Sequence, residues 1–248
     1  MGDTLQPLFY DLTFPQLKER LKELGEPSFR ARQVWQAVYT ELIADPLEIS
    51  TFSKPLRQKL SDVFSFSSLT PASKLASSDG QTIKTLFALP DGNAIEAVLM
   101  YYDERNTLCI STQAGCGMGC VFCATGQMGF KRNLTSGEIV EQVLYYARLL
   151  KNESKEVTNI VVMGMGEPFQ NYDAVMNAID RLNDPDGCNL GARRFTVSTV
   201  GLVPEIERFA AEKRQVNLAI SLHAANDALR SSLLPVNRKY PIAALMQA

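Results

Sequence analysis

Three cysteines crowd into a short glycine-rich stretch of this chain, AGCGMGCVFCATG at residues 114–126. Cys116, Cys120 and Cys123 lie four and three residues apart, and the glycines between them allow the sharp bend that would bring three thiolates together. A structural zinc site takes four ligands, usually as two paired halves, and no second half is present because the one histidine, His223, lies far downstream. A [4Fe–4S] cluster usually takes four cysteines, one per iron, so three cysteines would leave one iron open. The spacing therefore predicts a cluster with an open iron, the alternative being three buried structural cysteines.

Composition limits the class of protein. The chain has 248 residues, 46% of them hydrophobic, which is enough for a large domain with a buried core. Its formal net charge of -2 neither supports nor excludes RNA as a partner. The N-terminal stretch MGDTLQPLFYDLTFPQLKER has no basic segment followed by an apolar one, and runs such as NIVVMGM are too short to span a bilayer. We therefore expect a cytoplasmic protein with no membrane partner, in which a tight group of cysteines indicates metal binding or catalysis rather than disulfides.

Residues 1–72 have helical periodicity and are predicted to form a small accessory domain. LTFPQLKERLKELG has apolar residues at helical spacing and ends at Gly25, SFRARQVWQAVYT begins at Ser28 as a candidate N-cap, and FSKPLRQKLSDVF predicts a third helix. Residues 73–101 change to short β-like runs, TIKTLFALP and AIEAVLMYY, on either side of the turn signal DGN. These runs predict a β-hairpin extension of the domain that follows.

Residues 102–248 alternate between strands and helices and carry the cysteines. TLCIST, NIVVMGMGEP, RFTVSTVG and VNLAISLHA predict strands, and TSGEIVEQVLYYARLLKN, DAVMNAIDRLN and VPEIERFAAEK predict the helices between them. Such βα units build a parallel sheet, barrel-like or doubly wound, with ligand sites at the carboxyl ends of the strands. Only four strands precede YPIAALMQA, which begins a helix and stops without a C-cap, so we expect a protein that is incomplete at its C-terminus.

Taken together, these segments resemble one protein family. CxxxCxxC with Phe122 before the last cysteine resembles the signature of the radical S-adenosylmethionine (SAM) superfamily. TLCISTQAGCGMGCVFCATGQMGFKRNLTSGEI, NIVVMGMGEP, RFTVSTVG and LAISLHAANDALRSSLLPVNRKY extend the resemblance to the RlmN family of dual-specificity RNA methyltransferases and its relative Cfr. The resemblance implies an α/β fold: a partial radical-SAM (β/α) barrel, with its first four βα units, that carries the helical domain and the hairpin.

The resemblance also implies the cofactors and the residues that bind them. In the family the three cysteines hold a [4Fe–4S] cluster, its open iron binds the amino and carboxylate groups of SAM, and reduction cleaves SAM to a 5′-deoxyadenosyl radical. Taken alone, a Gly-Glu-Pro turn or a serine or histidine at a strand end is more often structural. Glu167 is suited to hold the SAM ammonium through a charge-assisted hydrogen bond. The SAM-binding residues that the resemblance implies are Gly166, Glu167, Ser198, Ser221, Leu222 and His223.

Two further residues acquire roles only through the resemblance. Glu96 lies in a mostly apolar strand, where alternation alone would place it on a solvent face; the family's pattern makes it the proton acceptor that helps to release methylated adenine. Cys109 precedes the cysteine loop and by composition would be an inert core residue; the family's pattern makes it the thiol that resolves a covalent protein–RNA intermediate. Cys188 matches no position of the family and is predicted to be an incidental loop cysteine.

The implied activity is methylation of adenine C2 in 23S ribosomal RNA and in certain transfer RNAs, by a monomer that receives electrons from a flavodoxin-like or ferredoxin-like donor. The methyl group would pass through a C-terminal cysteine that lies beyond this chain, so we expect the chain alone to be inactive. A Cfr-like enzyme that methylates adenine C8 and a non-catalytic iron–sulfur or RNA-binding fragment are the alternatives. The basic residues predicted to meet phosphates near the strand ends are Lys131, Arg132, Arg193, Arg194, Arg230, Arg238 and Lys239.

Overall fold

The computed structural model of this protein describes residues 6–248. Its N-terminal part is helical, as predicted, and α1 begins with a capping box between Thr13 and Gln16. Gly25, at φ 76°, follows the end of α1, also as predicted. Ser28 precedes α2 but already has helical φ and ψ, so its side chain caps no backbone N–H and the predicted capping role is wrong. The elements of this part are η1 (Phe9–Asp11), α1 (Phe14–Glu23), α2 (Phe29–Tyr39), η2 (Pro46–Glu48) and α3 (Lys54–Val63).

A mixed β-sheet forms the centre of the molecule, with strand order β1-β2-β3-β4-β7-β8-β9. The pairs β1–β2, β2–β3 and β3–β4 are antiparallel, whereas the pairs β4–β7, β7–β8 and β8–β9 are parallel. The four parallel strands are those predicted from the sequence. The strand bounds are β1 (Thr70–Ala76), β2 (Thr82–Ala88), β3 (Ala94–Tyr102), β4 (Arg105–Cys109), β7 (Asn159–Val162), β8 (Phe195–Thr199) and β9 (Asn217–Ile220).

The predicted hairpin is present, but a third strand extends it. β2 and β3 pair from Thr82↔Met100 to Ala88↔Ala94 around the DGN turn. β1 begins at Thr70, inside the range assigned to the helical domain, and all of its residues are exposed. Its sequence, TPASKLA, therefore lacks the apolar alternation that marks a half-buried strand. Because β3 also pairs with β4, the hairpin and the parallel strands belong to one sheet.

The helices that follow the parallel strands pack on the sheet. α5 begins at the predicted position, with a capping box between Thr135 and Glu138. None of the helices in residues 6–248 is long and apolar enough to cross a membrane. The remaining elements are β5 (Gln113–Gly115), α4 (Ala124–Gln127), β6 (Phe130–Asn133), α5 (Ser136–Asn152), η3 (Pro168–Asn171), α6 (Tyr172–Asn183), η4 (Ala192–Arg194), α7 (Val203–Ala211), α8 (Asp227–Leu233), η5 (Pro235–Arg238) and α9 (Ile242–Gln247).

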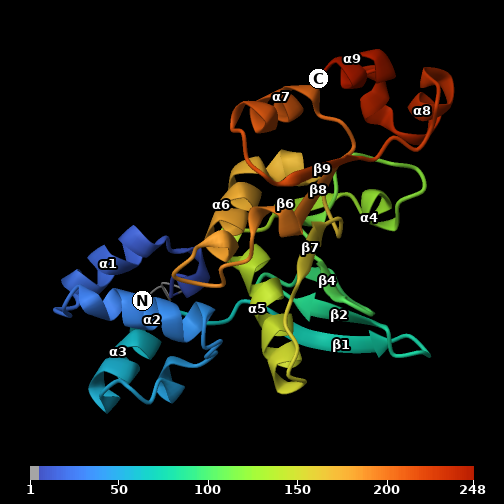
Figure 1. The fold of residues 1–248 in the computed structure, drawn as a ribbon. Helices are drawn as coiled ribbons and strands as arrows, with labels where there is room; N and C mark the ends of the chain where they lie inside the picture. The colour runs from blue at the N-terminus through green and yellow to red at the C-terminus, as the bar shows by residue number, and fades with distance from the viewer. Residues whose placement is uncertain (1–5) are drawn as a thin grey trace.

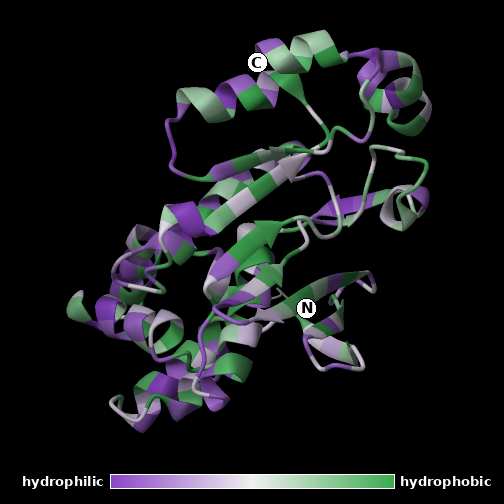
Figure 2. Ribbon diagram, turned by 45° about the vertical axis from the view of Figure 1, so that its right-hand side comes forward, coloured by the Kyte–Doolittle hydropathy of each residue, from purple (hydrophilic) through white to green (hydrophobic). Residues whose placement is uncertain are grey.

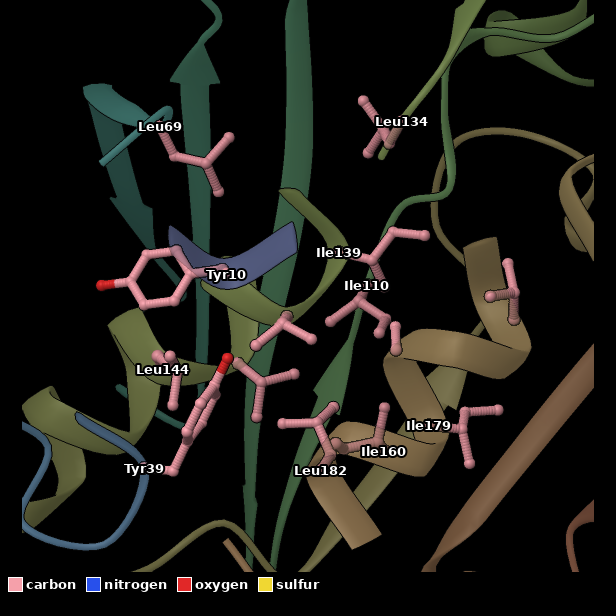
Figure 3. Close-up of a cluster of buried hydrophobic side chains, with 14 of the residues drawn as sticks. Tyr10, Tyr39, Leu69, Ile110, Leu134, Ile139, Leu144, Ile160, Ile179 and Leu182 are labelled. Atoms are coloured by element: carbon pink, nitrogen blue, oxygen red, sulfur yellow. The ribbon is translucent and has the colours of Figure 1, made fainter. Parts of the chain in front are cut away.

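A single hydrophobic core joins the helical part to the sheet. Figure 1 shows α5 and α6 between the sheet and the N-terminal helices. Figure 3 shows side chains of this core meeting there: Tyr10 and Tyr39 from the helical part, Leu144 from α5, Ile160 from β7 and Leu182 from α6. In Figure 2 the apolar residues gather along the central strands, while the outer helices alternate polar and apolar positions. The helical part is therefore packed against the sheet domain rather than tethered to it.

Polar contacts fix the same junction. The Asp11 carboxylate accepts a hydrogen bond from the backbone N–H of Gly137 at 2.7 Å, in the first turn of α5. A carboxylate at a helix N-terminus is favourable because the first N–H groups lack helical partners. A Cβ on Gly137 would lie 2.7 Å from the backbone nitrogen of Asp11, so only glycine permits this approach. From α5, Arg148 donates to the Tyr10 hydroxyl at 3.0 Å and to the Leu42 carbonyl at 3.0 Å.

Candidate functional site

A two-stranded ladder closes the base of the cysteine loop. β5 and β6 pair antiparallel, and the backbone N–H of Cys116 donates to the Gly129 carbonyl at 3.1 Å. Gly115, at φ 73°, lies where a Cβ would come within 1.9 Å of that same carbonyl oxygen. The first glycine of the stretch is therefore required by the close approach of the two ends of the loop.

Inside the loop the chain turns tightly around the cysteines. The N–H of Cys123 donates to the Cys120 carbonyl at 3.1 Å, and α4 begins directly after Cys123. A Cβ on Gly126 would lie 3.2 Å from both the nitrogen and the oxygen of Cys120, which leaves little room for a larger residue. Cys116 and Cys120 are buried, at 8% and 7% exposure, and Cys123 is half-buried. The three cysteines therefore share one short turn in which Cys116 and Cys120 are buried, while Val121 and Phe122 beside them are exposed.

The thiols of this turn act on one another electrostatically. Burial raises the pKa of Cys116 and raises that of Cys120 to about 11; a charge on Cys123 raises both further. Thiolates gathered in this way are stabilised by a positively charged centre. In a cluster each thiolate binds its own iron, so the three sulfurs need not surround one ion. In the part of the chain that the structure describes, no three Cys, His, Asp or Glu side chains do surround a single ion-sized point. The donor set and its spacing thus fit an iron–sulfur cluster.

Glu167 lies near Cys116 and Cys120, in the loop that follows β7 and directly precedes η3. Its carboxylate is 2% exposed and accepts hydrogen bonds from the backbone N–H groups of Phe169 at 3.0 Å and Val200 at 2.9 Å. Burial raises its pKa, and its charge in turn raises the pKa of Cys116. Among the ion pairs of residues 6–248, none includes this carboxylate. It is a buried anion that still has acceptor sites for a cation.

The residue before it, Gly166, has no room for a side chain. It has φ 104°, and a Cβ there would lie 2.6 Å from the Cβ of Gln113. Gln113 is fully buried; its amide oxygen accepts from the N–H of Glu167 at 2.8 Å, and its amide nitrogen donates to Asn133 at 2.8 Å. It thus joins the Gly-Glu turn to both strands of the cysteine loop. Sequence reasoning missed Gln113, because a glutamine within a strand signals nothing about distant partners.

The residues predicted at the ends of β8 and β9 lie close together. The hydroxyl oxygens of Ser198 and Ser221 are 3.1 Å apart, and the N–H of Ser221 donates to the Thr199 carbonyl. His223, at φ 60°, places its ring 4.6 Å from the ring centre of Phe122 in the cysteine loop. Leu222, which lies between Ser221 and His223 in the sequence, is 38% exposed. The segment that follows β9 therefore adjoins the cysteine loop through His223 and Phe122, and Ser198 adjoins that segment through Ser221.

Glu96 and Cys109 share another part of the same sheet. Cys109 pairs with Val98 across β3 and β4, and paired residues point to one face, which places Glu96 on that face too. Cys109 is a free, half-buried thiol, and burial raises its pKa to about 11. The Glu96 carboxylate forms an ion pair with Lys84 at 2.8 Å. The sequence did not predict that partner.

The structure corrects several of the predicted phosphate contacts. Arg132 forms ion pairs with the carboxylates of Asp91 and Glu138, so its charge is already balanced within the protein. Arg230 is fully buried. The 3-10 turn that carries Arg193 and Arg194 directly precedes β8, at the amino end of the strand, and is therefore on the opposite edge of the sheet from the cysteines. The remaining exposed candidates are Lys131, Arg238 and Lys239.

Cys188 lies at the junction with the helical part. Its thiol donates to the Tyr39 carbonyl at 3.3 Å, and burial raises its pKa to about 12. Its loop position agrees with the prediction, and its contact is with α2 rather than with the cysteine loop.

Known proteins resemble the whole chain. A profile of the Radical SAM superfamily matches residues 110–248, and a profile of the ribosomal RNA large subunit methyltransferase N-terminal domain matches residues 9–65. A probable dual-specificity RNA methyltransferase RlmN of Roseiflexus sp. is 44% identical over 282 residues, which cover 99% of this chain and 70% of the relative. The chain belongs to the RlmN family. A second protein of that name, from Chloroflexus aurantiacus, is 52% identical over 98% of this chain and 66% of its own length.

A solved structure agrees with this RlmN assignment. The crystal structure of a radical SAM methyltransferase from Sphaerobacter thermophilus superposes with a TM-score of 0.94 at 51% identity, over 97% of this chain and 71% of that one. The chain spans about two thirds of the length of the relatives it matches.

Proposed function

We propose that this chain is the cluster- and SAM-binding part of an RNA methyltransferase that methylates adenine C2 in 23S ribosomal RNA and in certain transfer RNAs. One observation carries the proposal: three free cysteines lie in a closed glycine-rich loop beside a buried, unpaired carboxylate at the carboxyl edge of parallel strands. Radical SAM relatives and an RlmN-type N-terminal domain support the same assignment.

In this proposal Cys116, Cys120 and Cys123 hold three irons of a [4Fe–4S] cluster. When bound, the cluster and SAM supply a carbon-centred radical that can act on an unreactive ring position. The buried Glu167 carboxylate accepts hydrogen bonds from the SAM ammonium, a cation that no ion pair within residues 6–248 provides. The other residues that we assign to the SAM pocket are Gly166, Ser198, Ser221, Leu222 and His223.

The finer fold assignment belongs to the same proposal. β4, β7, β8 and β9 are parallel, with helices packed on one face, and we assign them as the first four strands of a radical-SAM (β/α) barrel. In such folds ligands bind at the carboxyl ends of the strands. That edge is the one where the cysteine loop, Glu167 and the paired serines gather.

Cys109 and Glu96 are the residues we assign to proton and thiol chemistry. Burial raises the pKa of Cys109 to about 11, so this thiol must lose its proton before it can attack the sulfur of the cysteine that is linked to the RNA. The S–S bond forms as the bond from that sulfur to the methylene carbon breaks, and the carbon keeps the electron pair and takes up a proton as the methylated adenine is released. Glu96 lies on the same sheet face, and its carboxylate is proposed to accept a proton from the adenine ring. The Lys84 ammonium forms an ion pair with this carboxylate at 2.8 Å and so holds it in place on that face.

The partners follow from the chemistry. We propose that the chain acts as a monomer on RNA through exposed cations such as Lys131, Arg238 and Lys239, and that a flavodoxin-like or ferredoxin-like protein reduces the cluster. None of the chain's five cysteines matches the methyl-carrying cysteine that the family resemblance implies. We therefore expect this polypeptide alone to form no methylated RNA.

The test is anaerobic reconstitution of the chain with iron and sulfide, followed by addition of SAM and dithionite. Release of 5′-deoxyadenosine, with iron bound by wild type and lost in Cys120→Ala, is the expected result. A redox-active cluster that ignores SAM would instead indicate an electron carrier and overturn the proposal. The ring position is tested with a relative of full length: nucleoside mass spectrometry should show methylation at C2, and methylation at C8 would contradict the assignment.

A further inference from the structure

Arg230 is a charged side chain with no exposed surface and no carboxylate partner. It lies in α8, is 0% exposed, and forms no ion pair within residues 6–248. Every hydrogen bond that it donates ends on an uncharged oxygen. Nη2 donates to the Val200 carbonyl at 2.6 Å and Nε to the Leu222 carbonyl at 3.1 Å; Nη1 donates to the Asn237 side-chain oxygen at 2.5 Å and the Tyr240 carbonyl at 3.4 Å.

These acceptors come from separate segments that border the candidate SAM pocket. Val200 follows β8 and Leu222 follows β9, between Ser221 and His223. The backbone N–H of Val200 also donates to the Glu167 carboxylate. The turn after β8 is therefore held between a buried anion on one side and a buried cation on the other.

Burial of an unpaired guanidinium is costly, so the fold needs a reason to keep it. Burial lowers the pKa of Arg230, and the nearby charges of Asp227 and the Cys120 thiol oppose that shift. The guanidinium is thus within electrostatic reach of the cysteine loop. α8 also contacts the loop directly, through the hydrogen bond from the N–H of Val121 to the Leu233 carbonyl at 3.1 Å.

We propose that Arg230 is a positioning residue of the site: its planar fork fixes the turns after β8 and β9 in the form that binds SAM, and its charge offsets that of the nearby Cys120 thiolate in the cysteine loop. This inference rests on the proposed function. The proposed role needs the planar guanidinium as well as its positive charge. The ammonium of a lysine carries the same charge, but it has no rigid planar group of donors that could bind carbonyls of both turns at once.

The experiment compares Arg230→Lys and Arg230→Gln with wild type and with a matched control, Arg57→Lys. Arg57 likewise donates to three backbone carbonyls, those of Phe52, Leu47 and Ser50, but does so in the helical part of the chain. Each reconstituted full chain is assayed for iron content, for SAM affinity by equilibrium dialysis, and for the reduction potential of its cluster. Hydrogen exchange of residues 199–224 is measured in parallel on the chain without SAM.

In Arg230→Lys we expect iron loading like that of wild type, a SAM dissociation constant raised by at least about tenfold, and faster exchange at both turns. The retained charge should keep the reduction potential close to that of wild type. Arg230→Gln should weaken SAM binding similarly and also make the potential more negative, because the reduced cluster loses a nearby positive charge. Arg57→Lys should change none of these quantities.

The inference is overturned if Arg230→Lys binds SAM within about twofold of wild type and exchanges at the wild-type rate. An unchanged potential in Arg230→Gln would remove the electrostatic half of the inference. Failure of wild type itself to load iron or to bind SAM would contradict the proposed function instead. In that case the exchange rates of residues 199–224 still decide whether Arg230 fixes the two turns.

Discussion

Two of the glutamates buried within residues 6–248, Glu141 and Glu167, form no ion pair there: Glu141 lies in α5 against the linker between α3 and β1 (residues 64–69), and Glu167 lies near the carboxyl ends of the parallel strands. Glu141 is 4% exposed and Glu167 is 2% exposed, and burial raises the pKa of both. Glu141 accepts hydrogen bonds at 2.6–3.3 Å from Ser67, Ser68 and Leu69. Within residues 6–248, Glu167 accepts hydrogen bonds from the two backbone N–H groups already described, and the Thr199 hydroxyl supplies one further donor beside it.

The difference lies in how many donors each carboxylate meets. A carboxylate has roughly four acceptor sites, and the linker segment fills those of Glu141. Glu167 keeps sites in reserve, beside three thiols and the strand ends. Burial alone therefore does not separate a structural carboxylate from a binding one. The unused acceptor capacity at Glu167 is what indicates a cationic ligand.

Of the substitutions considered for these two buried glutamates, Gly166→Ala, next to Glu167, should lower the stability of the fold most. Gly166→Ala needs a positive φ and places a Cβ against Gln113, so we expect a loss of about 3 kcal/mol in the free energy of unfolding. Gly191→Ala is the matched control, because its Cβ meets nothing within 4 Å and its φ is -56°. Urea denaturation of the two variants measures both values. Equal stability of Gly166→Ala and Gly191→Ala would show that the Gly-Glu turn can relax.

The affinity for SAM should depend on Glu167 and not on Glu141. Glu167→Gln should raise the dissociation constant of SAM about 10- to 100-fold, the effect of losing one hydrogen bond between charged groups. Glu141→Gln should leave the constant unchanged, since Glu141 meets only the linker. Equilibrium dialysis with labelled SAM on the reconstituted chain measures both. Wild-type affinity in Glu167→Gln would mean that the SAM ammonium binds elsewhere.

Glu141→Gln should affect the stability of the fold, although it should not affect SAM binding. Glu141→Gln replaces an acceptor by an NH₂ group that faces the donors of Ser68, so we expect a loss of about 2 kcal/mol in the free energy of unfolding. Ser68→Ala removes only the hydroxyl bond and should cost about 1 kcal/mol. Chemical denaturation decides the order. If Ser68→Ala cost more than Glu141→Gln, the carboxylate would not be the centre of the linker contacts.

The local parts of the site were predictable from the sequence. The capping box of Thr135 and Glu138, the hairpin at DGN and the cysteine loop each carry their signal within a few residues. β1 was missed because it is exposed on both faces and shows no alternation. The prediction that Arg193 and Arg194 lie at the carboxyl ends of the strands was wrong, because both directly precede β8 and so lie at its amino end. Their place directly before a predicted strand already indicated this.

The non-local parts were not predictable in the same way. Gln113 and Arg230 form hydrogen bonds with residues that are distant in the sequence and are brought close by the fold. Neither residue belongs to a periodic pattern or a motif that would predict these partners. Arg230 was assigned to phosphate contacts because its segment was expected near the ends of the strands, where an arginine is usually exposed. Its burial depends on carbonyls at the ends of two strands, whose positions follow from the sheet and not from neighbouring residues in the sequence.

The smallest expected effect is on the pH dependence of stability. Burial raises the pKa of Glu141 in the folded chain above the ordinary value of 4.5, so the folded state holds its proton more tightly than the unfolded state. The stabilisation from this proton is complete below about pH 4.5 and is lost as the pH rises through the raised pKa. Wild type should therefore lose more stability than Glu141→Gln over that range, by about 1.4 kcal/mol for each unit of the shift.

Denaturation of wild type and Glu141→Gln at a series of pH values isolates this contribution, because all other titrating groups are shared. The same measurement with Glu167→Gln compares the two sites directly. SAM supplies a cation to Glu167 and none to Glu141, so added SAM should flatten the Glu167 contribution and leave the other unchanged. If SAM altered both contributions equally, the two carboxylates would respond as one coupled core, and acceptor capacity would not separate a binding site from a structural one.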